Sequence, residues 1–269
     1  MPSQSVELVV TDLDGTLWDH TCRAHPNTLR ALSEMSKAVP VIAATGRRPS
    51  SAFEKMREND FLMPAVLFDG AIGLLAESGP RFHYLPFDAE TYEQILDIFL
   101  RFGLEPVVNL DDARSCGVGR NPATHPEHLA DNAHNTRRID LTQAAARWNV
   151  LSLLICGGDD RLVAVFDEVK DVAAATLTPD VRYGGRSLSA RPRGATKWSG
   201  VTSYCREQGI RPDRVLAVAD GMNDLDLLAA AAIACVPASA CEEALGLATH
   251  TIAAPAEGGW AEVLEFVVS

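Results

Sequence analysis

The sequence VELVVTDLDGT, residues 6–16, contains the features from which the fold of this chain follows. Its first half is a near-continuous apolar run interrupted only by Glu7, as a strand covered by helices on both faces requires. Two aspartates, Asp12 and Asp14, follow at alternate positions. In an open α/β sheet the ligand site lies beyond the carboxyl ends of the parallel strands. The stretch therefore predicts a buried parallel strand that directs both carboxylates toward a ligand site.

The segments that follow alternate between helix and strand, which is typical of a parallel sheet. We expect a helix over residues 26–37, a strand over 39–44 and a helix from Pro49. Apolar runs over 65–68 and 71–75 flank Asp69-Gly70, a pair that favours the type I′ turn of a hairpin. The alternation returns after Gly194, where we expect helices over 196–208, 222–230 and 257–268 and strands over 215–219 and 233–236.

A separate α+β unit is predicted between these two parts. It is expected to contain strands over 82–85, 104–109 and 150–156, helices over 88–102 and 159–175, and a short strand pair around Val181 and Leu188. Residues 111–138 are rich in Gly, Asn, Pro, His and Arg and predict a loop with one short helix. The predicted fold is thus a Rossmann-like parallel α/β core over residues 1–75 and 186–269, interrupted by an inserted α+β domain over 76–185.

Composition narrows the class of protein. The chain of 269 residues is 47% hydrophobic, enough for a substantial core, and its formal net charge of −12 disfavours nucleic acid and anionic membranes as partners. No apolar run approaches the ~18 residues of a membrane span, and no export signal is visible. The six cysteines show no C-x-x-C spacing, so we expect reduced thiols and a cytoplasmic location.

The close spacing of Asp12 and Asp14 has a chemical consequence. Neighbouring carboxylates repel and raise each other's pKa, a cost that is tolerated if a divalent cation shares the site or if one group works as an acid. The alternative is structural, with Asp14-Gly15 serving only as a turn and Asp12 as a helix cap.

Three further motifs place polar groups where other strands end or a helix begins. Thr45-Gly46-Arg47 offers a hydroxyl and backbone N–H groups at a helix N-terminus, where an anion such as phosphate is stabilised. Lys197 begins a predicted helix, where an ammonium opposes the helix dipole and indicates an anionic partner. Asp220-Gly221-Met222-Asn223-Asp224 adds two carboxylates after a strand. Taken alone, Thr45-Gly46-Arg47 also fits a plain strand-to-helix turn, and Lys197 also fits a surface lysine. Taken together, the motifs indicate one site.

These residues resemble the motifs of the haloacid dehalogenase superfamily of phosphohydrolases, and the resemblance runs from the first strand to Gly259. The D-x-D-G-T motif corresponds to residues 12–16, the threonine motif to Thr45, the lysine motif to Lys197 and the acidic motif to residues 220–224. The inserted domain resembles the type-two cap, and the sequence is similar to the Cof-type branch (subfamily IIB). Two positions depart from it: Ala219 replaces the usual Gly, and Asp69-Gly70 replaces the usual Asn-Gly, which adds a charge where relatives contact the substrate.

The resemblance implies a Mg²⁺-dependent phosphatase that hydrolyses small phosphomonoesters, usually sugar phosphates, through an aspartyl phosphate. Asp12 would be the nucleophile, and Asp14 would protonate the leaving oxygen and then activate water. The phosphoryl group and substrate would be bound by Thr45, Gly46, Lys197 and Asn223. Mg²⁺ would be held by the carboxylates of Asp12 and Asp220 and the backbone carbonyl of Asp14, with Asp224 supporting it directly, through water or through Lys197.

Two other functions fit parts of this pattern. A phosphomutase resembles this chemistry but usually has a helical cap between the nucleophile and threonine motifs, where this chain has no room. A phospho-acceptor regulatory or binding module, such as a receiver domain, lacks both a cap and an acid two residues after the nucleophile. Turnover of a generic aryl phosphate would separate an enzyme from such a module.

Substrate specificity would come from the inserted domain. An arginine of residues 111–138 is expected either to bind a second anionic or polyhydroxyl group of the substrate or to be solvated. The arginines concerned are Arg114, Arg120, Arg137 and Arg138. A transition-metal site built from His125, His128 and His134 is disfavoured, because no Cys or carboxylate lies at a confirming spacing. Trp18, on a segment that resembles the family's mobile flap, either contacts substrate or packs in the core.

Overall fold

The strand expected at the N-terminus is present as β1 (Leu8–Thr11) in the computed structural model, which describes residues 5–111, 116–180 and 182–267. All four residues of β1 are buried, because the sheet is covered on both faces. Leu8 and Val10 pack into one apolar cluster, whereas Thr11 on the opposite face accepts a hydrogen bond from Trp260 Nε1 at 3.0 Å. The side chains of this apolar run therefore pack on both faces of the sheet.

β1 pairs in parallel with β12 on one side and with β2 on the other, within an eight-stranded sheet. The strands from β14 to β3 are parallel, and β4 and β5 add an antiparallel edge. Across the sheet the strands are β14 (His250–Ile252), β13 (Ile233–Pro237), β12 (Val215–Val218), β1, β2 (Val41–Ala44), β3 (Ala65–Leu67), β4 (Ile72–Leu74) and β5 (Arg81–Tyr84).

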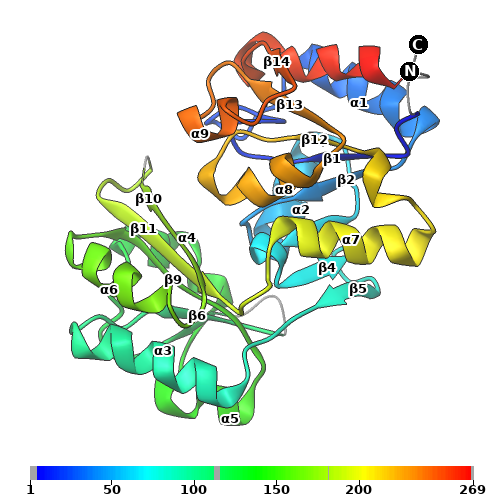
Figure 1. The fold of residues 1–269 in the computed structure, drawn as a ribbon. Helices are drawn as coiled ribbons and strands as arrows, with labels where there is room; N and C mark the ends of the chain where they lie inside the picture. The colour runs from blue at the N-terminus through cyan, green and yellow to red at the C-terminus, as the bar shows by residue number, and fades with distance from the viewer. Residues whose placement is uncertain (1–4, 112–115, 181, 268–269) are drawn as a thin grey trace. The chain divides into compact units, whose positions relative to one another are not determined.

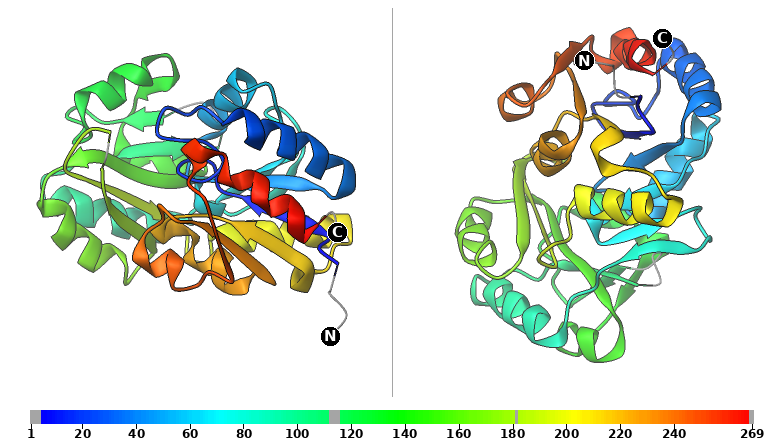
Figure 2. Two further views of the ribbon diagram at one scale, coloured as in Figure 1. Left: turned by 90° about the horizontal axis from the view of Figure 1, so that it is seen from above. Right: turned by 45° about the vertical axis from the view of Figure 1, so that its right-hand side comes forward.

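Helices cover both faces of this sheet (Figure 1). One face carries α1 (Pro26–Ala38) beside the C-terminal segment η7 (Gly259–Phe266), which is best seen in Figure 2. The other face carries α7 (Lys197–Gln208) and α8 (Leu225–Ala230). The remaining helices of this part are α2 (Pro49–Glu58) and the short α9 (Glu242–Leu245). The predicted closing helix over 257–268 is instead a pair of 3-10 segments, η6 (Pro255–Glu257) and η7.

The strand order creates the position for a site. From β1 the chain proceeds to β2 on one side, and it later returns to β12 on the other side of β1. The loops that leave the carboxyl ends of these three strands therefore diverge from a topological switch point, where α/β folds bind their ligands. The motifs at Asp12, Thr45 and Asp220 all follow these strands.

The predicted hairpin between β3 and β4 is present, but its connection is wider than a two-residue turn. Leu67 pairs with Ile72, so four residues span the turn. A type I′ turn would place positive φ at Asp69 and Gly70 only. Here φ is also positive at Phe68, which like Asp69 has a φ of 49°.

The second unit contains a six-stranded sheet covered by helices that supply its apolar core. All neighbouring strands are antiparallel except β7 and β8. The strands across the sheet are β10 (Ala174–Pro179), β11 (Arg186–Arg191), β9 (Val150–Gly158), β6 (Val107–Leu110), β7 (Cys116–Val118) and β8 (Thr136–Arg138). The helices are α3 (Ala89–Arg101), α4 (Pro126–Asp131), α5 (Ala144–Arg147) and α6 (Arg161–Val169).

Several predicted boundaries were wrong. The compact units are Met1–Tyr84 with Thr196–Ser269, and Leu85–Ala195, rather than units divided at residues 75 and 185. The strand expected near residue 82 is β5, which pairs with β4 and so belongs to the first unit. β11 pairs with β9 and β10 and so belongs to the second unit.

Two further predictions for the second unit need correction. The helix expected over 159–175 ends at Val169, because Ala174 already pairs with Arg191 in a strand. The region 111–138, expected to be loop with one helix, also contains β7 and β8. Its Gly and Asn content obscured these short strands, and Val181 lies outside the described residues.

No helix within the described ranges is long and apolar enough to cross a membrane.

The six cysteines all lie in the described ranges and are free thiols.

Candidate functional site

The sequence motifs converge on a pocket of about 320 Å³ at the carboxyl ends of β1, β2 and β12. Every motif of the first unit except Lys197 contributes to its wall. The lining residues are Asp12, Asp14, Thr45, Gly46, Arg47, Asp220, Gly221, Asn223 and Asp224.

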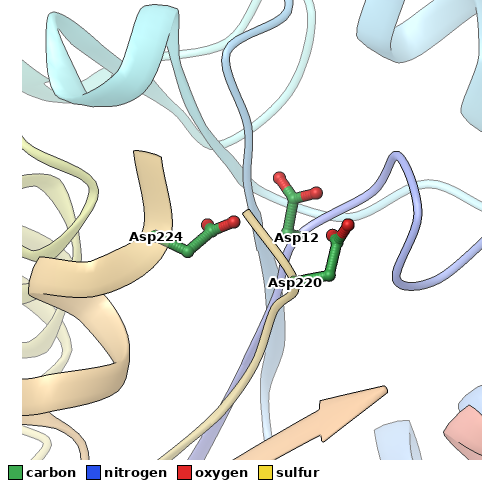
Figure 3. Close-up of side chains that lie close together, drawn as sticks. All are labelled: Asp12, Asp220 and Asp224. Atoms are coloured by element: carbon green, nitrogen blue, oxygen red, sulfur yellow. The ribbon is translucent and has the colours of Figure 1, made fainter. Parts of the chain in front are cut away.

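Three carboxylates form the floor of this site (Figure 3). Asp12, Asp220 and Asp224 each offer an oxygen, and these atoms all lie within 4.8 Å of one another. Asp12 follows β1, and the other two come from the loop after β12. The position of Asp220 depends on Gly15, whose φ is 79°, because an added Cβ there would lie 2.4 Å from Asp220 Oδ2. Thr16 Oγ1 donates to Asp220 Oδ1 at 2.5 Å.

Lys197 lies behind the carboxylates and is fully buried. Its Nζ is 2.7 Å from Asp12 Oδ1 and 2.6 Å from Asp224 Oδ1. Burial disfavours the ammonium, but the charges of Asp12 and Asp224 outweigh it and raise the lysine pKa. The anionic partner indicated by a lysine at a helix N-terminus is thus a pair of carboxylates.

One ammonium does not neutralise this cluster. Burial raises the pKa of Asp12 well above its usual range in spite of Lys197, and it likewise raises the pKa of Asp224. The pKa of Asp220 rises from 3.8 to about 6, mainly through burial and against the hydrogen bond from Thr16. A site with oxygen ligands from two buried carboxylates and one half-buried carboxylate, and with excess negative charge, suits a hard divalent cation such as Mg²⁺.

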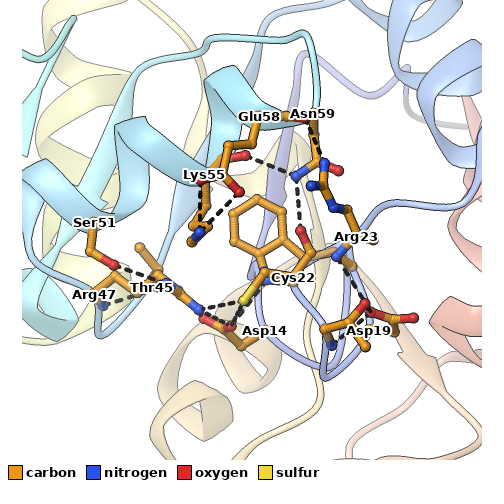
Figure 4. A network of polar contacts seen from close by, with 12 residues as sticks. Asp14, Asp19, Cys22, Arg23, Thr45, Arg47, Ser51, Lys55, Glu58 and Asn59 are labelled. Carbon is orange, nitrogen blue, oxygen red and sulfur yellow. Dashed lines mark hydrogen bonds and ion pairs between the residues drawn. The ribbon is translucent and has the colours of Figure 1, made fainter. Parts of the chain in front are cut away.

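Asp14 does not join the three carboxylates. Arg47 holds it in a bidentate pair, with Nε 2.6 Å from Oδ2 and Nη2 2.6 Å from Oδ1 (Figure 4). Trp18 Nε1 donates to the same Oδ1 at 3.0 Å. Burial would raise the pKa of Asp14, but the hydrogen bonds and charge of Arg47 outweigh burial and lower it. In this arrangement Asp14 is an ionised carboxylate.

The loop that carries Asp14 is pinned to the end of α2 by a buried amide. Asn59 Nδ2 donates to the carbonyls of Cys22 and Lys55 at 2.9 and 2.8 Å, and its Oδ1 accepts from the N–H of Ala24 at 2.9 Å. Arg47 Nη2 also lies 3.0 Å from Cys22 Sγ. Trp18 is fully buried and does not line the pocket, so the structure favours packing in the core over contact with substrate.

Thr45, Gly46 and Asn223 form the remaining wall. The Thr45 hydroxyl oxygen accepts from the N–H of Arg47 at 3.2 Å, a close turn at the start of α2. Asn223 Nδ2 donates to Asp69 Oδ1 at 2.8 Å. Beside its carboxylates, the pocket wall therefore carries a hydroxyl and a side-chain amide, together with Arg47.

Two residues contact the site in ways that the motifs do not predict. Arg47 belongs to the turn motif after β2, and a cation directly after an anion-binding turn is a signal for a residue of the site. Asp69 departs from the family pattern, and its carboxylate contacts Asn223.

The second unit contains a larger pocket of about 610 Å³. Its lining mixes two acidic and two basic residues with apolar ones, without the buried convergent carboxylates of the smaller pocket. The lining residues are Leu100, Glu105, Gly119, Arg120, Arg138, Ile139, Asp140, Leu141 and Thr142.

The arginines of this region differ in their environment. Arg138 Nη1 donates to the carbonyls of Gly119 and Arg120 at 2.6 and 2.8 Å, and Arg137 lies over the Trp148 ring at 5.3 Å. The guanidinium of Arg120 is exposed and makes no hydrogen bond or ion pair with the described residues. Arg114 lies outside the described residues.

Two histidines of the predicted histidine-rich loop pack against an aromatic ring. His125 stacks on the Tyr183 ring at 5.3 Å, and His128 lies edge-on to it at 5.8 Å. His134 is exposed. No group of metal-binding side chains that includes these histidines occurs in the described part of the chain.

Comparison with known proteins identifies the family. The model of the haloacid dehalogenase-like hydrolases matches residues 9–264. A Bacillus subtilis protein named 5-amino-6-(5-phospho-D-ribitylamino)uracil phosphatase is 26% identical, over 96% of each chain. An Arabidopsis thaliana protein named chloroplastic endoribonuclease YBEY is 22% identical over 84% of this chain, which spans only 40% of that protein.

Solved structures confirm the expected fold. A phosphatase of the haloalkanoate enzyme superfamily from Bacteroides thetaiotaomicron superimposes with a TM-score of 0.81, over 100% of this chain and 97% of its own, at 18% identity. A structure described as a subclass IIB sugar phosphatase gives a TM-score of 0.76, over 96% and 98% of the two chains, also at 18% identity. The chain belongs to the haloacid dehalogenase-like hydrolases.

Proposed function

We propose that this protein is a Mg²⁺-dependent phosphatase that hydrolyses small phosphomonoesters through an aspartyl phosphate. The observation that carries the proposal is the cluster of Asp12, Asp220 and Asp224, two of them paired with the buried Lys197, in a pocket that Thr45, Gly46 and Asn223 also line. The relatives named as phosphatases support the same reaction class. The free cysteines are consistent with a reducing, cytoplasmic location.

In the first step, a carboxylate oxygen of Asp12 attacks phosphorus and the ester oxygen leaves. Lys197 favours the ionised form of Asp12, which is the nucleophilic form. Thr45, Gly46 and Asn223 would hold the phosphoryl oxygens through hydroxyl, backbone and amide N–H groups, with Lys197 adding positive charge. In the second step water attacks phosphorus, so inorganic phosphate forms and the Asp12 carboxylate is released.

Asp14 would supply a proton to the leaving oxygen and then take one from the attacking water. Its bidentate pair with Arg47 suits the second task, because a base must be ionised. For the first task the carboxyl must carry a proton, which Arg47 opposes. A phosphoryl dianion would compete with Asp14 for the guanidinium and so weaken this opposition. Binding of substrate would thereby prepare the acid.

A magnesium ion would be held by the carboxylates of Asp12 and Asp220, with Asp224 and the backbone carbonyl of Asp14 completing the protein's contribution. When bound, it would offset the negative charge that opposes attack by a carboxylate on a phosphate dianion.

The test of the proposed function is phosphate release from a small aryl phosphate and from a panel of phosphorylated sugars, pyrimidines and glycolytic acids. A phosphatase releases phosphate from the aryl ester with multiple turnovers. A phospho-acceptor module would stop after one equivalent, and a phosphomutase would move the group between sugar positions without net release.

Asp14→Asn is expected to lower kcat/KM for alkyl phosphates by about 10²-fold or more, the usual contribution of general acid catalysis. The loss with an aryl phosphate should be much smaller, because that leaving group departs without a proton. The measurement is the ratio of the two losses. Equal losses on both substrates would contradict an acid role.

Arg120→Ala is expected to lower kcat/KM for the best sugar phosphate by about tenfold, as for a lost charged hydrogen bond, and to leave an aryl phosphate nearly unchanged. The reason is that Arg120 is exposed and unpaired among the described residues, whereas Arg138 holds backbone carbonyls. Arg147→Ala, at another exposed arginine of the second unit, is the matched control. If neither substitution separates the two substrates, Arg120 has no part in specificity.

A further inference from the structure

The turn between β3 and β4 holds consecutive residues in an unfavourable backbone conformation. Phe68 and Asp69 both have φ of 49°, and Cys22 and Asp60 are the other non-glycine residues with positive φ in the described part of the chain. Such conformations cost free energy and persist where the surrounding structure fixes them.

The surroundings of this turn fix it from two sides. The N–H groups of Phe68 and Asp69 donate to the carbonyls of Arg47 and Thr45, both at 3.1 Å. On the other side, an added Cβ on Gly70 would lie 2.0 Å from the carbonyl oxygen of Thr196, the N-cap of α7. The turn is thus held between the loop after β2 and the helix that begins with Lys197.

This conformation directs the Asp69 side chain inward. Asp69 is only 6% exposed, and it is not among the residues that line the pocket. Its Oδ1 accepts from Asn223 Nδ2 at 2.8 Å, and Gly46 leaves room for it, since an added Cβ there would lie 3.1 Å from the same oxygen. Asp69 therefore lies behind Asn223 with respect to the pocket.

A carboxylate in this position determines which way the amide faces. An ionised carboxylate only accepts hydrogen bonds, so it selects the amide orientation that places Nδ2 toward Asp69. Asn223 Oδ1 then faces Gly221, where an added Cβ would lie 2.7 Å from it. The second hydrogen of Nδ2 remains for a ligand of the pocket. An asparagine at position 69 could donate as well as accept, and so would permit either orientation.

We propose that Asp69 is a positioning residue that fixes the Asn223 amide with an N–H directed to the phosphoryl group. The inference rests on the proposed function, because Asn223 binds phosphoryl oxygens only there. It assigns to the strained turn a role in substrate binding, since the turn places the acceptor that orients Asn223.

The test is a double-mutant cycle of Asp69→Ala and Asn223→Ala, with an aryl phosphate as substrate and inorganic phosphate as competitive inhibitor. Asp69→Ala is expected to lower kcat/KM about tenfold or more and to weaken inhibition by phosphate, as loss of a charged hydrogen bond would. In the Asn223→Ala background, Asp69→Ala should change kcat/KM and the inhibition by phosphate by less than about twofold each. Asp69→Asn should lie between wild type and Asp69→Ala in kcat/KM and in phosphate inhibition.

Asp60→Ala is the matched control, because Asp60 is an exposed aspartate with φ of 60° outside the pocket lining. Its kinetics should equal those of the wild type. If Asp69→Ala fails to fold, Asp69→Asn takes its place in the cycle, since asparagine tolerates left-handed backbone.

Independent effects of the two substitutions, or wild-type kinetics for Asp69→Ala, would overturn the inference while leaving the phosphatase intact. A wild-type protein that releases no phosphate from any substrate would overturn the proposed function, and this inference with it.

Discussion

Asp12→Asn is expected to abolish phosphate release while the fold is retained. In the proposed mechanism Asp12, which follows β1 and lies 2.7 Å from Lys197 Nζ, is the group that attacks phosphorus. An amide is a poor nucleophile and cannot form the acyl phosphate. The fold should survive because Lys197 keeps Asp224 as a partner at 2.6 Å.

The measurement is steady-state turnover together with the thermal midpoint of unfolding. Asp19→Asn, at a half-buried aspartate of the same loop that does not line the pocket, serves as the control and should keep wild-type turnover. Activity of Asp12→Asn within a factor of ten of wild type, ~1.4 kcal/mol in the barrier, would be too high for a variant without its nucleophile.

Removal of divalent cations is expected to eliminate turnover, and Mg²⁺ to restore it. The acidic cluster has three carboxylates and one buried ammonium, so without a cation its residual negative charge repels a phosphate dianion. The measurement is activity after chelation and after return of Mg²⁺ or Zn²⁺. Full activity in excess chelator, or recovery with Zn²⁺ but not Mg²⁺, would contradict an oxygen-ligand site for a hard cation.

Cation binding should also be visible without turnover, as a rise in the thermal midpoint with Mg²⁺. Burial raises the pKa of Asp220 from 3.8 to about 6. A raised carboxyl pKa stabilises the fold at pH below ~4 and loses this contribution as pH rises through about 6. A cation replaces the proton, so stabilisation by Mg²⁺ should grow over that interval and be much smaller in Asp220→Asn.

The sequence predicted the parallel core well because its signals are local. The apolar run of β1 and the motifs at strand ends each identify an element from a few adjacent residues, and the strand order then brings them together. Lys197 illustrates this: its unfavourable place at a helix N-terminus predicted anionic neighbours, and Asp12 and Asp224 are those neighbours.

The parts that were not predicted depend on contacts between distant residues. The pair of Asp14 and Arg47 joins positions 33 residues apart, and the pair of Asp69 and Asn223 joins positions 154 apart. Neither has a spacing rule. The boundary near residue 84 was missed for the same reason, because β5 joins the first sheet by pairing with β4 rather than by any local signal.

The most direct test of the central claim is to locate the covalent phosphoryl group. The protein would be mixed with Mg²⁺ and an aryl phosphate, quenched in acid during turnover, digested and analysed by mass spectrometry. Asp14→Asn, which should slow hydrolysis of the intermediate, would raise its yield. The account predicts a phosphoryl group on Asp12, absent from Asp12→Asn. Two results would contradict it. One is an active wild-type enzyme whose phosphoryl group lies on another residue; the other is an Asp12→Asn variant that releases phosphate as fast as the wild type.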